Sequence, residues 1–324
     1  MAKNKKSSET KGSVHDGVKA GIQALMAHAM RASGAQVCLA SDLADRVWGL
    51  PCDHISYRWL SDNTCYQMGK IFGVAGLKES CKSAYAMSMA KLWMDAGGIC
   101  IYIDTENKKS PVLYKAVVGE ANTQRTLDYV SFSTEEWQEQ LIDALNFSKD
   151  DPHLKDSPVM VIVDSLGGVD TEESRESIEK EGSAKGRSTG GMIKCKSHNA
   201  FFRYISKELF LRPHALTYIN HLSDDPMSPI QGAKKKPGGT GQDYHAVLDF
   251  WFSVVKSTPV YKATRGFTEN ILKIKVNKNS MGTSQRNVEI PYRWSKDPDS
   301  GEMLSCWFDW DAATAILLAD DSPT

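Results

Sequence analysis

The chain has 324 residues, of which 41% are hydrophobic and 24% are charged, and its formal net charge is −1. This composition is ordinary for a globular protein and excludes an overall polycation, so any binding of nucleic acid must rely on local basic patches. The apolar runs are strand-sized and the amino terminus lacks the apolar core of a signal peptide, so we expect a cytoplasmic protein without a membrane span. The seven cysteines are odd in number and form no C-x-x-C pair, which suits a reducing compartment and argues against zinc.

The first predicted elements precede the main domain. Residues 1–12 are rich in Lys and Ser and are predicted to form a disordered basic tail. Apolar residues recur at helical spacing over residues 14–31, and a short apolar stretch follows at residues 37–40. We expect residues 13–49 to form a helix and a strand that pack on their own domain or on a neighbouring subunit.

A glycine turn follows the next apolar run, which covers residues 71–75 and suits a buried strand, and the residues after the turn are helix formers. The turn matches the phosphate-binding loop G-x-x-x-x-G-K-[S/T] except at its second glycine, and it consists of Gly76, Leu77, Lys78, Glu79, Ser80, Cys81, Lys82 and Ser83. Backbone N–H groups of such a loop bind phosphate, while the lysine adds charge and the serine offers a hydroxyl to Mg²⁺. A positive φ costs a residue with a Cβ about 1–2 kcal/mol, so we expect Cys81 to present its N–H without the glycine conformation.

Two further buried strands are predicted at residues 99–103 and 158–163, and acidic residues follow both of them. Carboxylates at the ends of parallel strands face the ligand crevice, so Glu106 and Asp164 should lie near the glycine turn. Asp164 has the Walker-B position for holding Mg²⁺, and Glu106 could polarise an attacking water. An Asp that closes a strand is often only a turn cap, and this alternative stays open for Asp104 and Asp164. The predicted chemistry is ATP hydrolysis.

Strands and helices alternate over residues 50–294, which predicts an α/β core with a mainly parallel central sheet, followed by a short cap and tail at residues 295–324. Two glycine-rich loops interrupt this core, at residues 181–191 and 223–241. The second loop carries Lys234, Lys235 and Lys236. Such loops can follow a phosphate backbone, because glycine permits close approach and lysine releases counterions; simple surface disorder is the alternative.

Six motifs appear in a fixed order: the glycine turn, Asp104-Thr105-Glu106, and residues 163–167, 219–221, 237–241 and 273–278. In this order and spacing, residues 50–294 resemble the RecA-type strand-exchange recombinases, most closely the phage UvsX-like branch, which also has a bulky residue before the loop lysine. The resemblance implies a RecA-like P-loop ATPase core that uses ATP and Mg²⁺. It also implies single-stranded and double-stranded DNA as partners, assembly of identical subunits into a helical filament, and single-strand-binding and mediator proteins as further partners.

The resemblance also assigns roles to residues of the nucleotide site. Lys82 binds phosphate, Ser83 and Asp164 hold Mg²⁺, and Glu106 is the general base. His221 senses the γ-phosphate, and Lys275 and Lys278 reach the ATP of a neighbouring subunit. The family stacks adenine on a tyrosine; here Tyr114 stands slightly out of register for that role.

The two glycine-rich loops correspond to the DNA-binding loops of the family. An apolar side chain of the second loop enters between bases, with Met227 and Ile230 as the candidates. The residues expected to contact DNA are Lys185, Arg187, Lys196, Arg203, Met227, Ile230, Lys234, Lys235, Lys236, Gly238 and Gly239.

Two other functions remain possible at this point. A ring-forming helicase motor shares the fold, but it would normally carry an arginine finger where this chain has Lys275 and Lys278. A non-hydrolysing accessory paralogue would explain the altered glycine turn, yet it has no chemical reason to keep all four of Lys82, Ser83, Glu106 and Asp164.

Overall fold

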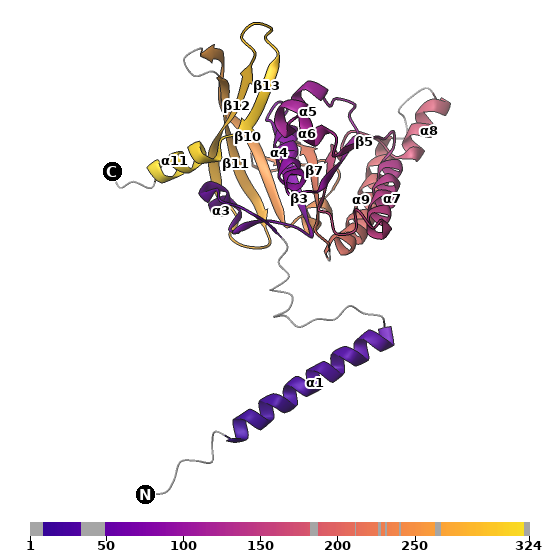
Figure 1. Ribbon diagram of the computed structural model, residues 1–324. Coiled ribbons are helices and arrows are strands. Elements are labelled where there is room, and N and C mark those ends of the chain that lie inside the picture. Colours follow the sequence, from indigo (N-terminus) through magenta and orange to yellow (C-terminus); the bar gives the residue numbers. More distant parts are fainter. Residues whose placement is uncertain are drawn as a thin grey trace, which may run out of the picture. The chain divides into compact units, whose positions relative to one another are not determined.

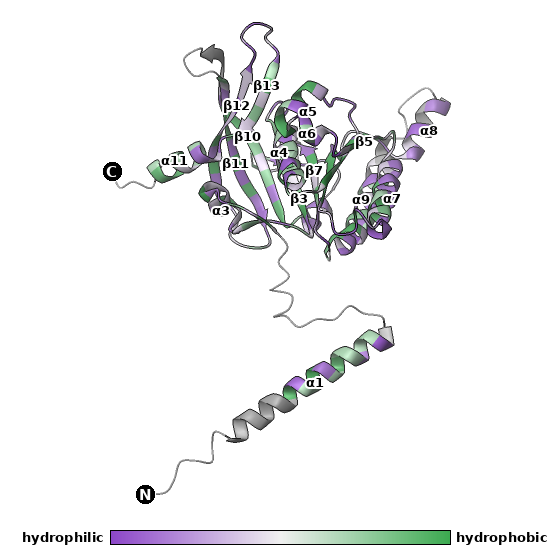
Figure 2. Ribbon diagram, in the orientation of Figure 1, coloured by the Kyte–Doolittle hydropathy of each residue, from purple (hydrophilic) through white to green (hydrophobic). Residues whose placement is uncertain are grey.

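The computed structural model describes residues 9–33, 49–181, 187–210, 212–225, 228–230, 232–239, 241–262 and 267–320. The chain divides into two compact units, residues 1–47 and 48–324. In the first unit, the predicted helix is confirmed as α1 (Glu9–Ser33), which also takes in part of the predicted basic tail. The side chains of Val18, Ile22, Leu25 and Met30 are exposed on it, and the coloured part of the helix in Figure 2 has both hydrophobic and hydrophilic residues. The predicted strand at residues 37–40 lies outside the described residues.

Within the described residues, nine strands of the second unit form one mixed sheet, in the order β13-β12-β11-β10-β3-β7-β6-β4-β5 (Figure 1). Neighbouring strands from β10 to β5 are parallel, and those from β10 to β13 are antiparallel. The strands are β3 (Lys70–Gly76), β4 (Ile99–Asp104), β5 (Thr126–Val130), β6 (Val159–Asp164), β7 (His214–His221), β10 (Leu248–Lys262), β11 (Phe267–Asn279), β12 (Asn287–Lys296) and β13 (Met303–Phe308). The protein is therefore an α/β protein with a large, mostly parallel mixed sheet flanked by helices.

The two faces of the sheet bury separate hydrophobic clusters. In β4, Cys100 and Tyr102 belong to one cluster while Ile101 and Ile103 belong to the other, as the twofold alternation of a strand requires. The first cluster includes residues of α4 (Lys82–Asp95), α5 (Pro111–Val118), α3 (Ile55–Ser61) and α11 (Trp310–Asp320). The second includes residues of α7 (Thr134–Asp150) and α9 (Arg187–Phe210). Burial on both faces explains why the parallel strands read as nearly continuous apolar runs.

Shorter elements complete the second unit. They are the helices α6 (Glu120–Thr123), α8 (Glu172–Glu181) and α10 (Gly241–His245), the pair β1 (Gly49–Pro51) with β2 (Cys65–Gln67), and the pair β8 (Ser223–Asp224) with β9 (Lys234–Lys235). Helix α8 is strongly hydrophilic (Figure 2). No helix in the described parts of the chain is long and apolar enough to cross a membrane.

The region predicted to be a short cap contributes a strand to the central sheet. Strand β13 pairs with β12, so the sheet extends beyond residue 294. Trp310 is buried and packs edge-on against Tyr57, which places it in the core as a structural residue.

Candidate functional site

The glycine turn connects β3 directly to α4, at the carboxyl edge of the parallel strands. A Cβ on Gly76 would lie 2.7 Å from the Phe252 carbonyl oxygen and would also clash with the Ser80 hydroxyl, so this position requires glycine. Lys82 is buried, and its Nζ donates to the Leu77 carbonyl oxygen at 2.6 Å and to Ser80 Oγ at 3.3 Å. Burial lowers the pKa of Lys82, while the nearby carboxylates of Asp164 and Glu106 raise it. The ammonium group therefore lies within the loop, where a phosphate would bind.

Cys81 adopts the left-handed conformation, with φ 60° and ψ 24°. Our expectation that it would avoid the glycine conformation is wrong. The residue is the N-cap of α4, and its carbonyl oxygen accepts the Tyr85 amide at 3.0 Å, so the start of the helix fixes the turn. The Cβ costs about 1–2 kcal/mol in this conformation. Burial raises the pKa of the Cys81 thiol to about 12, which keeps it protonated and unreactive at neutral pH.

Asp164 lies at the end of β6, opposite the first turn of α4. Its Oδ2 accepts the Tyr102 hydroxyl at 2.7 Å, and it lines the same cavity as Ser83. Burial raises the pKa of Asp164, and the hydroxyls of Ser83 and Tyr102 partly oppose the shift. The structure thus brings together the two residues predicted to hold a metal ion.

Asp104 has a different role. Its two carboxylate oxygens accept the backbone amides of Glu106 at 3.1 Å and Lys109 at 2.9 Å. It therefore caps the turn after β4, as the simpler interpretation of the sequence allowed.

The oxygen ligands present suit magnesium better than a transition metal. Among the described residues, no group of three or more His, Cys, Asp or Glu side chains is arranged to hold a metal ion. Mg²⁺ keeps several waters and commonly takes only one or two protein ligands together with substrate phosphates. The hydroxyl of Ser83 and the carboxylate of Asp164 meet this requirement.

Glu106 receives hydrogen bonds from three side chains. Its Oε1 accepts from Ser165 Oγ at 2.5 Å and lies 2.8 Å from His221 Nε2, and its Oε2 accepts from Lys108 Nζ at 2.8 Å. Burial alone would raise the pKa of Glu106, but the donors Lys108, Ser165 and His221 outweigh it and lower the pKa to about 2. The sequence predicted Glu106 and His221 and missed the two other donors, although Ser165 directly follows Asp164 and Lys108 stands two residues after Glu106.

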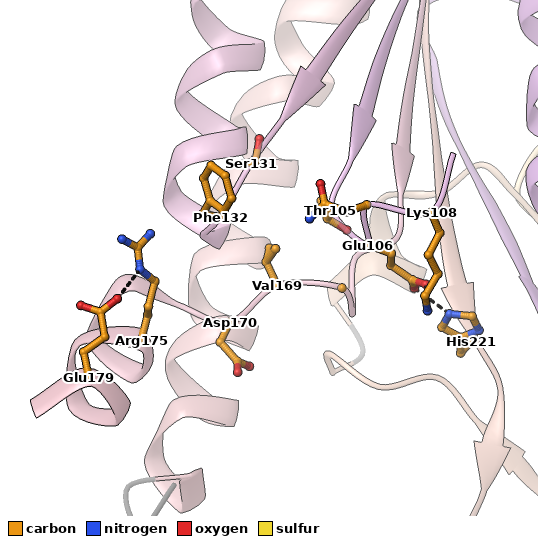
Figure 3. Close-up of a pocket in the computed structure, with 12 residues that line it drawn as sticks. Thr105, Glu106, Lys108, Ser131, Phe132, Val169, Asp170, Arg175, Glu179 and His221 are labelled. Carbon is orange, nitrogen blue, oxygen red and sulfur yellow. Dashed lines mark hydrogen bonds and ion pairs between the residues drawn. The ribbon is translucent and has the colours of Figure 1, made fainter. Parts of the chain in front are cut away.

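Two cavities meet at this carboxylate. One, of about 440 Å³, is lined by the glycine turn and Asp164, with Leu113, Tyr292 and Trp294 among its apolar residues. The other, of about 700 Å³, extends toward α8, and Figure 3 shows Glu106 with Lys108 and His221 at one end and Arg175 with Glu179 at the other. Glu106, Lys108 and His221 line both cavities.

Tyr114 does not agree with its predicted role as an adenine platform. It is absent from the lining of the 440 Å³ cavity, and only 3% of it is exposed. Its hydroxyl bonds to Thr126 Oγ1 at 2.6 Å and the ammonium of Lys109 lies over its ring, so the tyrosine is part of the packing between α5 and β5.

The three lysines predicted to contact DNA in the second loop all have acidic partners. Lys234 pairs with Asp224 at 2.6 Å and Lys235 with Asp225 at 3.2 Å, across the β8–β9 pair. The Lys236 side chain is 3% exposed and pairs at 2.8 Å with Asp249, whose side chain is fully buried. Lys236 is therefore a core residue in this conformation, and its predicted contact with a phosphate backbone disagrees with the structure.

A hydrogen-bond network joins the end of β7 to the second loop. Asn220 donates to the Pro237 carbonyl oxygen at 3.0 Å and to Gln242 Oε1 at 2.7 Å, and its own oxygen accepts the His221 amide at 2.8 Å. Gln242 donates in turn to the Gly239 carbonyl oxygen at 2.9 Å. A change at His221 can thus reach the loop through a short path of buried polar groups.

The remaining predicted residues occupy varied positions. Lys196 and Arg203 are exposed on α9, seven residues apart and so on the same face of the helix, and Ile230 is also exposed. Gly238 and Gly239 have positive φ, which permits the turn that leads into α10. Lys185 and Met227 lie outside the described residues, and Arg187 begins α9.

The two lysines of β11 differ from one another. Lys275 is exposed, whereas Lys278 donates to the carbonyl oxygens of Asp243 at 2.5 Å and Tyr244 at 3.0 Å in α10. Burial lowers the pKa of Lys278. In this conformation Lys278 is bound to its own chain, and a contact with a neighbouring subunit would require it to leave α10.

The chain matches no protein-family model and no curated protein sequence.

Proposed function

We propose that this chain is a RecA-type recombinase that hydrolyses ATP with Mg²⁺, assembles on single-stranded DNA as a helical filament and exchanges DNA strands. The observation that carries the proposal is the convergence of a phosphate-binding loop, a Ser83–Asp164 pair and the Glu106–His221 pair around one 440 Å³ cavity. The order of the motifs along the chain, which resembles that of the recombinases, supports the choice of activity.

Each residue has a defined task in this proposal. The backbone amides of the glycine turn and the Lys82 ammonium hold the nucleotide phosphates, and Ser83 and Asp164 hold Mg²⁺. Glu106 accepts a proton from the attacking water, and His221 relays the state of the site to the second loop through Asn220. Bound Mg²⁺ neutralises charge on the phosphates.

The proposal is tested by nucleotide-dependent filament formation. Electron micrographs of the wild-type protein with single-stranded DNA and a non-hydrolysable ATP analogue should show helical filaments. Lys82→Ala should abolish them, because the buried ammonium is lost from the phosphate site. Lys91→Ala, which removes an exposed lysine from the same helix, is the matched control and should form filaments normally.

The roles in hydrolysis are tested separately. Glu106→Gln should keep ATP binding and filament assembly and stop turnover, because an amide cannot accept the proton. Hydrolysis at the wild-type rate would contradict the general-base role. Hexameric rings that unwind forked duplexes would favour a helicase motor, and a wild-type protein without ATPase activity on long single-stranded DNA would favour an accessory paralogue.

A further inference from the structure

Both carboxylate oxygens of Glu106 are already engaged. Ser165 contacts Oε1. Figure 3 shows the two other donors at this carboxylate: His221, which also contacts Oε1, and Lys108, whose ammonium contacts Oε2 at 2.8 Å. The Glu106 side chain is only 15% exposed, so few directions remain from which a water could approach. A general base needs an oxygen that can accept a proton from the attacking water. Ser165 and His221 contact Oε1 and leave Oε2 available, but the Lys108 ammonium occupies Oε2.

The three donors differ in how easily they can leave. Ser165 is fully buried directly after β6. His221 is the last residue of β7, and 44% of its side chain is exposed. Lys108 lies between β4 and α5, and 77% of its side chain is exposed. A long, exposed side chain can change its position without moving the backbone. Lys108 is the most exposed of the three donors and contacts Oε2, so it is the donor most easily released.

The cavity beside Lys108 leaves space for its ammonium group to move. Besides Lys108, the lining of this 700 Å³ cavity includes Asp170, and Arg175 and Glu179 of α8, which leads into the predicted first DNA-binding loop at residues 181–191. His221, at the same carboxylate, connects through Asn220 to the second loop. A DNA phosphate bound by these loops would compete with Glu106 for the ammonium group.

We propose that Lys108 is a positioning residue that restrains Glu106 in the absence of DNA, and that a DNA phosphate draws its ammonium away and so frees the carboxylate for hydrolysis. This inference rests on the proposed function of the site. On this proposal, a subunit that is not bound to DNA hydrolyses ATP slowly, although the residues for catalysis are in place.

The test is a steady-state ATPase assay with and without saturating oligo(dT), on the wild type and on Lys108→Met. The variant should raise kcat without DNA by about two- to five-fold, the range that an exposed ion pair can supply. Its kcat with DNA and its KM for ATP should match the wild type, so the stimulation by DNA falls. Lys108→Arg keeps the charge and should restore the low DNA-free rate.

Lys115→Met is the control, because it removes another exposed lysine of an ion pair, with Glu120, that lines neither cavity. It should leave both rates unchanged. If the wild type is active and Lys108→Met leaves the DNA-free rate unchanged or lowers it, this inference is overturned while the proposed function stands. A wild type that hydrolyses no ATP with or without DNA would remove the proposed function and this inference with it.

Discussion

At the scale of single residues, Cys81 keeps the left-handed conformation at the position where the phosphate-binding pattern has its second glycine. The backbone there is left-handed because β3 ends at Gly76 and α4 begins at Lys82, which leaves few paths between the two ends. Glu79 in the same loop also has a positive φ, of 62°. Strain of this kind persists only where the surrounding structure determines the backbone, as it does in this loop.

The strain predicts a difference between two substitutions. Cys81→Gly should be more stable than Cys81→Ala by about 1 kcal/mol, because both remove the sulfur and only glycine removes the Cβ. Urea denaturation measures the difference. At Cys100, inside β4, the order should reverse, because glycine weakens a strand. If glycine were the less stable choice at both positions, the left-handed turn would carry no strain.

The hydrogen bonds of Glu106 predict a dependence of stability on pH. They lower its pKa to about 2 in the folded state, below the value of about 4.3 for an unfolded chain. The resulting stabilisation, on the order of 2 kcal/mol, is therefore present above pH 4.3 and is lost as the pH falls toward 2.

Urea denaturation of the wild type and of Glu106→Gln at pH 7 and pH 3 tests this expectation. The wild type should have the larger free energy of unfolding at pH 7. The difference from Glu106→Gln should be smaller at pH 3. Glu139→Gln, at an exposed site on α7, is the control and should show a small effect at both values. A gap for Glu106→Gln that is equal at both pH values would contradict the lowered pKa.

At the scale of elements, the second loop is held to the sheet by a buried ion pair. Asp249 of β10 accepts from Lys236, from Trp251 Nε1 at 3.0 Å and from Asn277 Nδ2 at 2.8 Å. The pair thus joins the loop to two neighbouring strands. With the Asn220 network at its other side, this contact fixes where the loop returns to the core.

Neighbouring lysines of this loop should respond differently to substitution. Lys236→Met should lower the free energy of unfolding by about 3 kcal/mol, because it leaves the Asp249 carboxylate buried without its cation. Lys235→Met should lower it by less than about 1 kcal/mol, since its pair with Asp225 is partly exposed. Chemical denaturation of both variants provides the comparison. Equal, small effects would show that the Lys236 pair opens in solution.

At the scale of the whole molecule, the net charge of −1 gives no general attraction to DNA. Several cations of the described residues are neutralised by partners, including Lys234 and Lys236. The exposed face of α9 that carries Lys196 and Arg203 becomes the more important candidate for contacts with phosphate. Binding would then depend in part on this small patch, and salt would weaken it in proportion to the number of phosphate contacts.

This patch predicts a change in the salt dependence of binding. The double variant Lys196→Met/Arg203→Met should reduce the slope of log affinity for single-stranded DNA against log salt by about 1.4, which corresponds to two phosphate contacts. Fluorescence anisotropy at several salt concentrations gives the slope. Lys149→Met/Lys155→Met, which removes two exposed charges at the end of α7 and just beyond it, should keep the wild-type slope. If Lys196 and Arg203 do not contact DNA, their double variant should keep the wild-type slope, as the control does.

Features that depend on local physics could be predicted from the amino-acid sequence. Apolar runs of strand length, glycine where a Cβ does not fit, and acids at strand ends predicted the parallel core and the approach of the glycine turn to Asp164. Contacts between side chains that are far apart in the sequence depend on the tertiary structure. Glu106 and His221 are 115 residues apart, and the pairing of Lys236 with Asp249 depends on how a loop returns to β10. Contacts of this kind follow from the order of strands in the sheet and from burial, which no local pattern encodes.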